Sequence, residues 1–314
     1  MASKALVKLP RLDLSDEGLQ PGSESWGLVR AQVRQALETF GCFEAVFPKV
    51  PEELRRAIFP ALDELFSLPT EAKLRNISDK PSHGYVGQYP HLPLFESMGI
   101  EDAEIPEEAQ KFTALMWPPH GNQSFSETIC SFSKHVGELD QMVRRMVLES
   151  LGVEKYLDSH MQLTRYVLRV MKYKGPDTAE ATMGLGAHSD SNIVTILYQN
   201  QDGLEIQTKD GRWIPVSTSP DSFVVMTGDS FTAWSNGRVH APEHRVMMTG
   251  SEVRYSAGLF AMPKAGHLVR APDELVDEEH PLLYKPFDHM DFLRFHRTRL
   301  NQTVKAALNE FCGA

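Results

Sequence analysis

Two histidines and an aspartate in the second half of the chain have the types and spacing of a metal site. His188 and Asp190 are separated by one residue, and His244 lies 56 positions after His188. Two neutral imidazoles and one carboxylate suit ferrous iron, and a three-ligand set leaves coordination positions open for a chelating co-substrate and for dioxygen. These residues therefore predict a mononuclear iron centre.

An arginine and a serine lie shortly after the second histidine. Arg254 follows His244 by ten positions and is separated from Ser256 by one residue. On a strand, residues i and i+2 share a face, so the guanidinium and the hydroxyl can point at the same ligand. Both faces of the run from Arg254 to Phe260 look buried, and a buried guanidinium needs an anion, for which a carboxylate is a good geometric match. The pair predicts an anchor for a small acid chelated to the iron.

The choice of third metal ligand lies between His240 and His244. His240 precedes Ala241-Pro242 and is expected in irregular chain just after a turn, at the surface or the rim of a pocket. His244 begins an apolar run that ends at Met248, as a barrel strand would. We therefore expect His244 to be the ligand.

With these motifs the chain resembles the plant-type iron(II)- and 2-oxoglutarate-dependent dioxygenases, whose pattern is His-x-Asp, a distant His and then Arg-x-Ser. The resemblance covers most of the chain and is greatest to the AOP-like branch, in residues 168–174, 192–200 and 277–283. The family has an Asn-Tyr-Tyr triplet before the metal motif, and Tyr173 stands at its last position, whereas Met171 replaces the Asn and removes a polar contact. The resemblance implies Fe(II) ligation and catalysis by His188, Asp190 and His244, and 2-oxoglutarate binding by Arg254, Ser256 and Tyr173.

The resemblance also implies an activity. Such an enzyme converts 2-oxoglutarate and dioxygen to succinate and CO2 while it hydroxylates, desaturates or demethylates a small plant specialised metabolite or hormone-like molecule, and ascorbate is expected to support it. Two alternatives stay open. One is an Fe(II) oxidase of the same fold that does not use 2-oxoglutarate, which Arg254 and Ser256 do not exclude. The other is a non-catalytic small-molecule binding protein, which the intact metal triad disfavours.

The composition limits the class of protein and its partners. With 41% hydrophobic and 24% charged residues, the chain is expected to be globular, neither disordered nor a membrane protein. Its net charge of −10 disfavours a nucleic-acid partner. The N-terminus lacks the apolar stretch of a signal peptide, no window is long enough for a transmembrane helix, and three scattered cysteines suit a reducing compartment. We expect a cytoplasmic monomer that acts on a small molecule.

The elements that position the site change from about Gln162 to short β-rich runs separated by turns. Residues 1–155 are expected to form a helix-rich N-terminal region that supports the barrel, residues 156–265 the Fe(II)/2-oxoglutarate core, and residues 266–314 a helical C-terminal segment. In the first region we predict a short strand over 9–14 and a helix over 26–40. A second helix is expected to begin at Pro51 and to be broken or kinked at Pro60. A third is expected from a capping box of Ser124 and Glu127 to Gly152.

In the core, short β-rich runs follow one another closely, and Asp210-Gly211 between two of them is a strong hairpin signal. The runs are residues 167–171, 194–198, 204–207, 213–216, 223–226, 245–248 and 254–260. This density favours a barrel or sandwich over a parallel sheet. The resemblance makes it a double-stranded β-helix, or jelly roll, so the fold class is mixed α/β (α+β). One helix over 288–311 is expected to close the chain.

The pocket for the organic substrate is predicted at the mouth of the jelly roll. Residues 81–99 are rich in Gly, Pro, His and aromatic residues without a clear period, and are expected to form a covering loop together with the C-terminal helix. Aromatic side chains suit a compact, partly apolar ligand. Tyr85, Tyr89, Phe95 and Phe260 are therefore the candidate substrate contacts.

Overall fold

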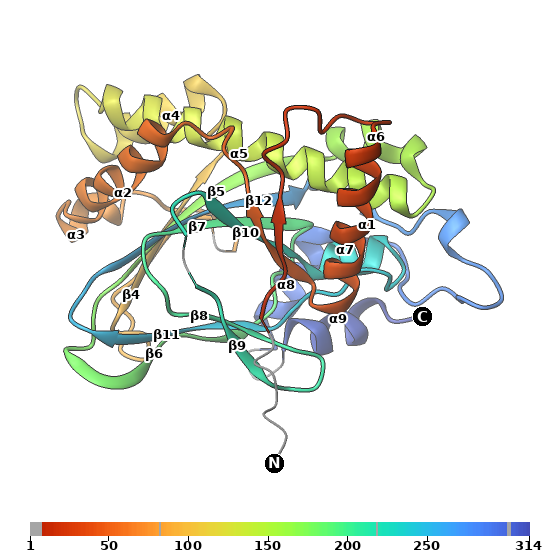
Figure 1. Cartoon of the computed structure of the whole chain (residues 1–314). Coiled ribbons are helices and arrows are strands. Elements are labelled where there is room, and N and C mark those ends of the chain that lie inside the picture. The colour runs from red at the N-terminus through yellow and green to blue at the C-terminus, as the bar shows by residue number, and fades with distance from the viewer. Residues whose placement is uncertain (1–7, 82, 218, 300–302) are drawn as a thin grey trace, which may run out of the picture.

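Two β-sheets that face each other form the centre of the molecule in the computed structural model (Figure 1). The structure describes residues 8–81, 83–217, 219–299 and 303–314. The larger sheet has the strand order β1-β2-β10-β7-β12-β5-β4-β3 and the smaller the order β6-β11-β8-β9. This arrangement confirms the predicted α+β class with a jelly-roll core. No helix in the described ranges is long and apolar enough to cross a membrane.

The strands are β1 (Arg11–Asp13), β2 (Cys42–Val46), β3 (Tyr85–Val86), β4 (Phe95–Glu101), β5 (Thr164–Tyr173), β6 (Thr178–His188), β7 (Val194–Gln199), β8 (Leu204–Gln207), β9 (Trp213–Pro215), β10 (Ser222–Thr227), β11 (His244–Gly250), β12 (Arg254–Pro263), β13 (Leu268–Val269) and β14 (Phe287–Asp288). The α-helices are α1 (Glu24–Thr39), α2 (Glu52–Phe66), α3 (Thr70–Lys73), α4 (Pro106–Met116), α5 (Gln123–Ser150), α6 (Leu157–Gln162), α7 (Asp229–Trp234), α8 (His289–Arg297) and α9 (Val304–Cys312). Two 3-10 turns cover Glu154–Tyr156 and Asp273–Leu275.

The larger sheet is buried on both faces, which explains why its central strands are apolar along their whole length. Every residue of β7 and β10 is buried. One face carries α2 and α5, which lie across it in Figure 1, and the other face turns toward the smaller sheet. β8 and β9 pair through the predicted Asp210-Gly211 turn, where Gly211 has a φ of +83° that favours glycine.

The long helix α5 packs its apolar face on the sheet as its period predicts. The residues expected to face inward are all buried, namely Ile129, Phe132, Val136, Leu139, Val143 and Val147. The predicted capping box at Ser124 is wrong. Asn122 is the N-cap, because its side-chain oxygen accepts a hydrogen bond from the backbone N–H of Phe125 (3.0 Å), and Ser124 therefore lies inside the helix.

The second helix is not broken at Pro60, which was one of the two effects expected of this proline. α2 starts at Glu52, directly after Pro51, and continues through Pro60 to Phe66. Ile58 and Leu62, on either side of the proline, are fully buried in the core. Burial of this face offsets the backbone hydrogen bond that a proline removes inside a helix.

We expected residues 81–99 to form a loop, and this expectation is wrong for the described residues of this range, which exclude residue 82. They contain β3 and most of β4, and β4 pairs with β5 so that Phe95 lies opposite Tyr173. Most of β4 is buried on both faces, so its sequence lacks the polar–apolar alternation of a half-exposed strand. Tyr85, at the start of β3, therefore belongs to the edge of the larger sheet.

The C-terminal segment forms two helices, where one was predicted. α8 begins after Asp288, whose side chain caps it, and ends at Arg297. α9 begins after Thr303, whose hydroxyl accepts from the backbone N–H of Ala306. Residues 300–302 of the predicted helix lie outside the described part of the chain. The two helices pack against each other and share an apolar cluster that includes Phe292 and Leu308.

Candidate metal centre and adjoining cavity

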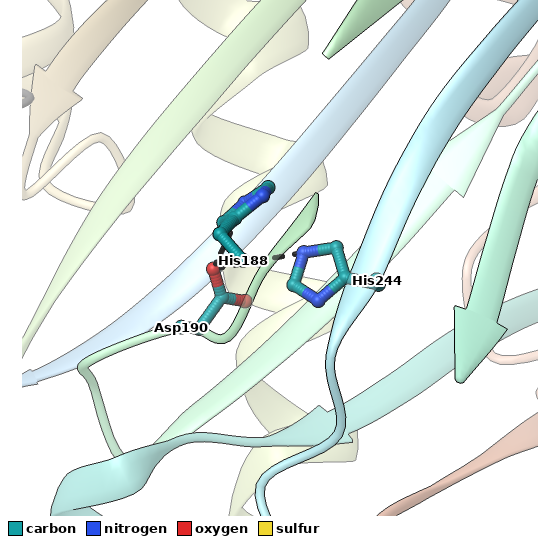
Figure 2. A group of neighbouring side chains, drawn as sticks. All are labelled: His188, Asp190 and His244. Carbon is teal, nitrogen blue, oxygen red and sulfur yellow. Dashed lines mark ion pairs between the residues drawn. The ribbon is translucent and has the colours of Figure 1, made fainter. Parts of the chain in front are cut away.

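The three predicted metal ligands meet at the junction of β6 and β11 (Figure 2). His188 is the last residue of β6, His244 is the first of β11, and the two are direct partners in the antiparallel ladder. Asp190 lies in the turn that follows β6. One nitrogen or oxygen atom from each side chain lies within 4.8 Å of the others, so the group could hold a metal ion.

Hydrogen bonds to backbone carbonyls fix the orientation of the His188 and His244 rings. The Nδ1 atoms of His188 and His244 lie 2.9 Å and 3.4 Å from the carbonyl oxygens of Gly186 and Pro242. A carbonyl only accepts, so each Nδ1 carries the proton and each Nε2 keeps its lone pair. Both Nε2 atoms lie 3.9 Å from Oδ1 of Asp190. The lone pairs and the carboxylate oxygen therefore converge, which fits a metal ion.

The surroundings of the triad keep the His188 imidazole neutral and hold the Asp190 carboxylate in one orientation, as metal binding requires. Burial, reinforced by the neighbouring His244, lowers the pKa of His188 to about 4, so this imidazole is neutral at neutral pH. The other carboxylate oxygen of Asp190 accepts a hydrogen bond from the Thr195 hydroxyl (2.5 Å). The carboxylate is thus held with one oxygen toward the histidines.

His240 lies apart from this group. Its side chain is partly buried, its backbone oxygen accepts from the Thr227 hydroxyl (2.6 Å), and it is not among the residues that line the cavity beside the triad. The structure therefore brings His244, and not His240, together with His188. The expectation that His240 lies at the pocket rim is not met.

The predicted anchor residues are buried on neighbouring strands of the larger sheet. Arg254 lies opposite Tyr173 in the β12–β5 ladder, and its guanidinium carbon lies 4.9 Å from the centre of the Tyr173 ring. Two of its nitrogens donate to Gln199 and to the backbone oxygen of Gln201. Nη1 of Arg254 and Oγ of Ser256 are buried without a hydrogen-bond partner among the described residues. A carboxylate placed here would satisfy both atoms, so the residues fit 2-oxoglutarate.

A cavity of about 740 Å³ joins the triad and the anchor. All four predicted aromatic contacts line it, namely Tyr85, Tyr89, Phe95 and Phe260. The Phe95 ring packs on the Tyr173 ring with centroids 5.1 Å apart, and the Tyr85 hydroxyl donates to Glu96 (2.9 Å). Leu293 of α8 and Val304 of α9 also line the cavity, so the C-terminal helices cover it as expected.

Sequence reasoning missed several polar residues of the cavity wall, among them Arg169 and His83. Arg169 lies on β5 four residues before Tyr173, and His83 precedes β3. The strand period could have identified Arg169, because residues i and i+4 of a strand share a face. No local pattern marks His83.

Comparison with known proteins agrees with this arrangement. Sequence models of two families match the chain: the 2OG-Fe(II) oxygenase superfamily over residues 159–263, and the N-terminal region of the non-haem dioxygenases of morphine synthesis over residues 9–111. The chain is 50% identical over 310 residues to the probable 2-oxoglutarate-dependent dioxygenase AOP1.2 of Arabidopsis thaliana, covering 97% of this chain and 95% of that protein.

Two solved structures have the same fold. The rice dioxygenase for auxin oxidation superposes with a TM-score of 0.82 at 30% identity, covering 98% of this chain and 100% of that one. JOX2 in complex with 2OG, Fe and JA gives a TM-score of 0.81 at 26% identity, covering 98% and 90%.

Proposed function

The chain belongs to the 2OG-Fe(II) oxygenase superfamily and is a 2-oxoglutarate-dependent dioxygenase, and from this premise we propose which residues carry the reaction and on what class of molecule. His188, Asp190 and His244 hold Fe(II), and Arg254, Ser256 and Tyr173 bind 2-oxoglutarate. The organic substrate is a small plant specialised metabolite or hormone-like molecule. Tyr85, Phe95 and Phe260 contact that substrate.

The observation that carries the proposal is the pair of unsatisfied buried groups beside the triad. Nη1 of Arg254 and Oγ of Ser256 have no partner among the described residues, and both side chains are almost inaccessible to solvent. A buried donor without a partner costs free energy, and a buried guanidinium costs more than a neutral group. The cost is removed when the far carboxylate of 2-oxoglutarate accepts from both.

The remaining residues orient the reactants and limit access of water. When bound, iron and 2-oxoglutarate use dioxygen to supply the oxidising power, with release of succinate and CO2. Arg254 fixes one end of 2-oxoglutarate, so its other end reaches toward the triad in a defined direction. Thr195 holds the Asp190 carboxylate, and the apolar wall formed by Phe260 and Leu293 reduces the water around the substrate.

Coupled succinate release tests the proposal. The purified chain with Fe(II), ascorbate and 2-oxoglutarate is incubated with a panel of plant metabolites, and succinate and oxidised product are quantified together. We expect equimolar succinate and product with at least one small molecule, and loss of both in the Asp190→Ala variant. Product without succinate would identify an oxidase that does not use 2-oxoglutarate, and turnover of a peptide in preference to every small molecule would refute the substrate class.

We also propose that the enzyme acts as a cytoplasmic monomer with no nucleic-acid partner. The net charge of −10 supports the last point, and three free, buried cysteines (Cys42, Cys130 and Cys312) are in keeping with a reducing compartment. Sedimentation at micromolar concentration and a fluorescent fusion in plant cells are the measurements.

A further inference from the structure

His83 is a buried polar residue on the wall of the cavity. It precedes β3, is only 4% exposed, and is among the residues that line the cavity beside the triad. The residues proposed to hold Fe(II) and 2-oxoglutarate do not include it. Its polar atoms therefore have no part in binding either of them.

One ring nitrogen of His83 is bonded to the backbone and the other has a lone pair. Nδ1 lies 2.7 Å from the carbonyl oxygen of Pro81. A carbonyl only accepts, so Nδ1 carries the proton and Nε2 of the neutral ring keeps a lone pair. Nε2 has no hydrogen-bond partner within residues 8–81, 83–217, 219–299 and 303–314, and it is not among the atoms that the protein seals off completely. It is therefore an acceptor that a ligand in the cavity can reach.

The His83 ring is neutral at neutral pH. Burial lowers its pKa below the ordinary value of 6.5, and the Pro81 carbonyl and the charge of Glu101 oppose that shift. The Glu101 carboxylate is itself paired with Lys80 and Arg165. The lone pair on Nε2 thus stays available to accept a hydrogen bond.

Hydrogen bonds to β4 hold the chain on either side of His83. The Asn76 side chain donates to the backbone oxygen of Gly99 (3.0 Å), and the Asn76 backbone oxygen accepts from the N–H of Tyr85 (2.8 Å). The N–H of Gly99 donates to the backbone oxygen of Gly84 (3.4 Å). A Cβ on Gly99 would come within 2.4 Å of the His83 backbone oxygen, so the close approach requires glycine. The imidazole is held in place before a ligand arrives, which lowers the entropic cost of binding.

The register of the sheet places His83 beyond the 2-oxoglutarate anchor. Phe95 on β4 lies opposite Tyr173, and Gly99 follows Phe95 by four residues. At about 3.3 Å per residue this is roughly 13 Å along the strand. Because the His83 backbone lies over Gly99, His83 lines the part of the cavity that 2-oxoglutarate leaves for the organic substrate.

Apolar side chains line the same cavity. Val167 and Phe260 are direct partners in the β5–β12 ladder and both belong to its wall. Met262, on the same strand as Phe260, and Leu293 of α8 add to this surface. A ligand that fills the space is expected to have an apolar body with a few polar groups at defined points.

We propose that Nε2 of His83 accepts a hydrogen bond from a hydroxyl or N–H group of the organic substrate, so that the enzyme selects small molecules with an apolar body and a donor at this point. The proposal rests on the function proposed above. A molecule of the same shape without the donor leaves a buried acceptor unsatisfied and is therefore disfavoured. His83 is then a specificity-determining residue that lies outside the metal and 2-oxoglutarate sites.

The test compares molecules with and without a donor by calorimetric titration of enzyme saturated with Mn(II) and 2-oxoglutarate. The probes are substituted phenols and anilines, each compared with the fluoroarene of the same skeleton, which is similar in size but cannot donate. We expect the donors to bind about five- to a hundredfold more tightly, which corresponds to the cost of an unsatisfied buried acceptor. Tighter binding of the anilines than of the phenols would identify an N–H group as the donor.

Variants assign the preference to the residue. His83→Phe keeps a flat ring but removes the acceptor and should bring the ratio between donor and fluoroarene to near one. His83→Gln, which offers a carbonyl oxygen, should retain part of the preference. His91→Phe is the matched control, because His91 is in the same segment, packs on the Tyr89 ring with centroids 5.4 Å apart, and does not line the cavity.

Titration with 2-oxoglutarate shows whether each variant is folded. If His83→Phe fails this check, His83→Leu takes its place with the same expectation. Phenols and anilines that bind no better than the fluoroarenes, that do not bind, or that keep their advantage without the imidazole would each overturn the role of His83. Coupled succinate release from molecules without a donor would then leave the oxygenase function intact. A preference that depends on His83, in an enzyme that releases no succinate with any small molecule, would contradict the proposed function alone.

Discussion

At the scale of single residues, the site depends on buried side chains whose polar atoms have few available hydrogen-bond partners. The Nδ1 atoms of the two histidines are committed to backbone carbonyls, which leaves Nε2 for the metal. Arg254 is fully buried, and one of its nitrogens has no hydrogen-bond partner in the described ranges of the chain. A buried polar atom without a partner costs free energy until its ligand binds. Because the histidines face the metal site and Arg254 faces the 2-oxoglutarate site, we expect each substitution to weaken the binding of one ligand.

Replacing a triad residue should remove metal binding. We expect His188→Ala, Asp190→Ala and His244→Ala to lose measurable Mn(II) binding by calorimetry and all iron-dependent turnover. His240→Ala should keep most of both, because His240 lies outside the cavity wall. Loss of metal binding in His240→Ala with retention in His244→Ala would show that the ligand assignment is wrong.

Arg254→Ala should weaken 2-oxoglutarate selectively. Removing one partner of a buried ion pair costs about 3–5 kcal/mol, which is roughly two to three and a half orders of magnitude in affinity. The KM for 2-oxoglutarate should rise by far more than that for the organic substrate. Arg245→Ala, which removes an arginine that packs on Trp213 outside the cavity, is the control. Equal losses for both substrates would point to general misfolding.

At the scale of elements, the pairing of β6 with β11 positions the metal ligands, and the N-cap residue decides where α5 begins. β6 ends at one metal ligand and β11 begins at another, so the register of that one strand pair sets the site. At the N-terminus of α5, two polar residues could serve as the cap. Asn122 precedes Ser124 and satisfies the Phe125 N–H, which leaves Ser124 in the first turn.

Removing the α5 cap should destabilise the fold measurably. Asn122→Ala should lower the free energy of unfolding by about 1 kcal/mol, the usual worth of an Asn N-cap. Ser124→Ala is the matched control and should change it by less than about 0.5 kcal/mol, because Ser124 is exposed within the helix. Urea unfolding followed by circular dichroism measures both. A larger effect at Ser124 would restore the capping box that the sequence suggested.

At the scale of the whole molecule, the cavity is enclosed by segments from both ends of the chain. β3 and β4 extend the larger sheet on one side, and α8 and α9 close another. His289, the first residue of α8, is fully buried where this segment meets α7. The Ser230 hydroxyl donates to the Ser191 backbone oxygen, so Nδ1 of His289 is the donor to Ser230 (3.0 Å). Nε2 of His289 is buried and has no hydrogen-bond partner within the part of the chain that the structure describes.

This buried imidazole should make the fold sensitive to acid. Burial lowers the pKa of His289 to about 4, below its ordinary value of 6.5, so protons bind the unfolded chain more readily. Its contribution is complete above about pH 6.5 and is lost as the pH falls toward 4. His289→Asn, which keeps a donor toward Ser230, should reduce the decline in unfolding free energy between pH 7 and pH 5. His120→Asn, at an exposed histidine, is the control, and an equal reduction there would contradict this origin.

The sequence by itself determined the features that are local in the chain or repeat with a regular period. The triad and the Arg-x-Ser pattern could be recognised because the spacing of a motif can be counted along the sequence. The roles of these residues as ligands remain predictions. The inward face of α5 and strands such as β7 and β10 followed from period and apolar runs. Tyr85, Phe95 and Phe260 were expected at the mouth of the barrel because they are aromatic, and they line the cavity, although Tyr85 and Phe95 lie on strands and not on a loop.

Tertiary structure decided what depends on pairing between distant segments. β4 and β6 carry no clear alternation, because burial on both faces of β4 and ladder irregularities along β6 remove the period. Asn and Ser are similarly good N-caps, so residue type alone does not place the start of α5 at Asn122 rather than at Ser124. The region before residue 155 supplies four strands to the same sheet as β5. The sequence predicted the first of them, over 9–14, but no local pattern indicated that it joins this sheet. The strand period indicates which face of β5 carries Arg169, but only the register of the sheet places it between Gly99 and Gly258 on the cavity wall, since side chains from separate strands share a wall only after the sheet has formed.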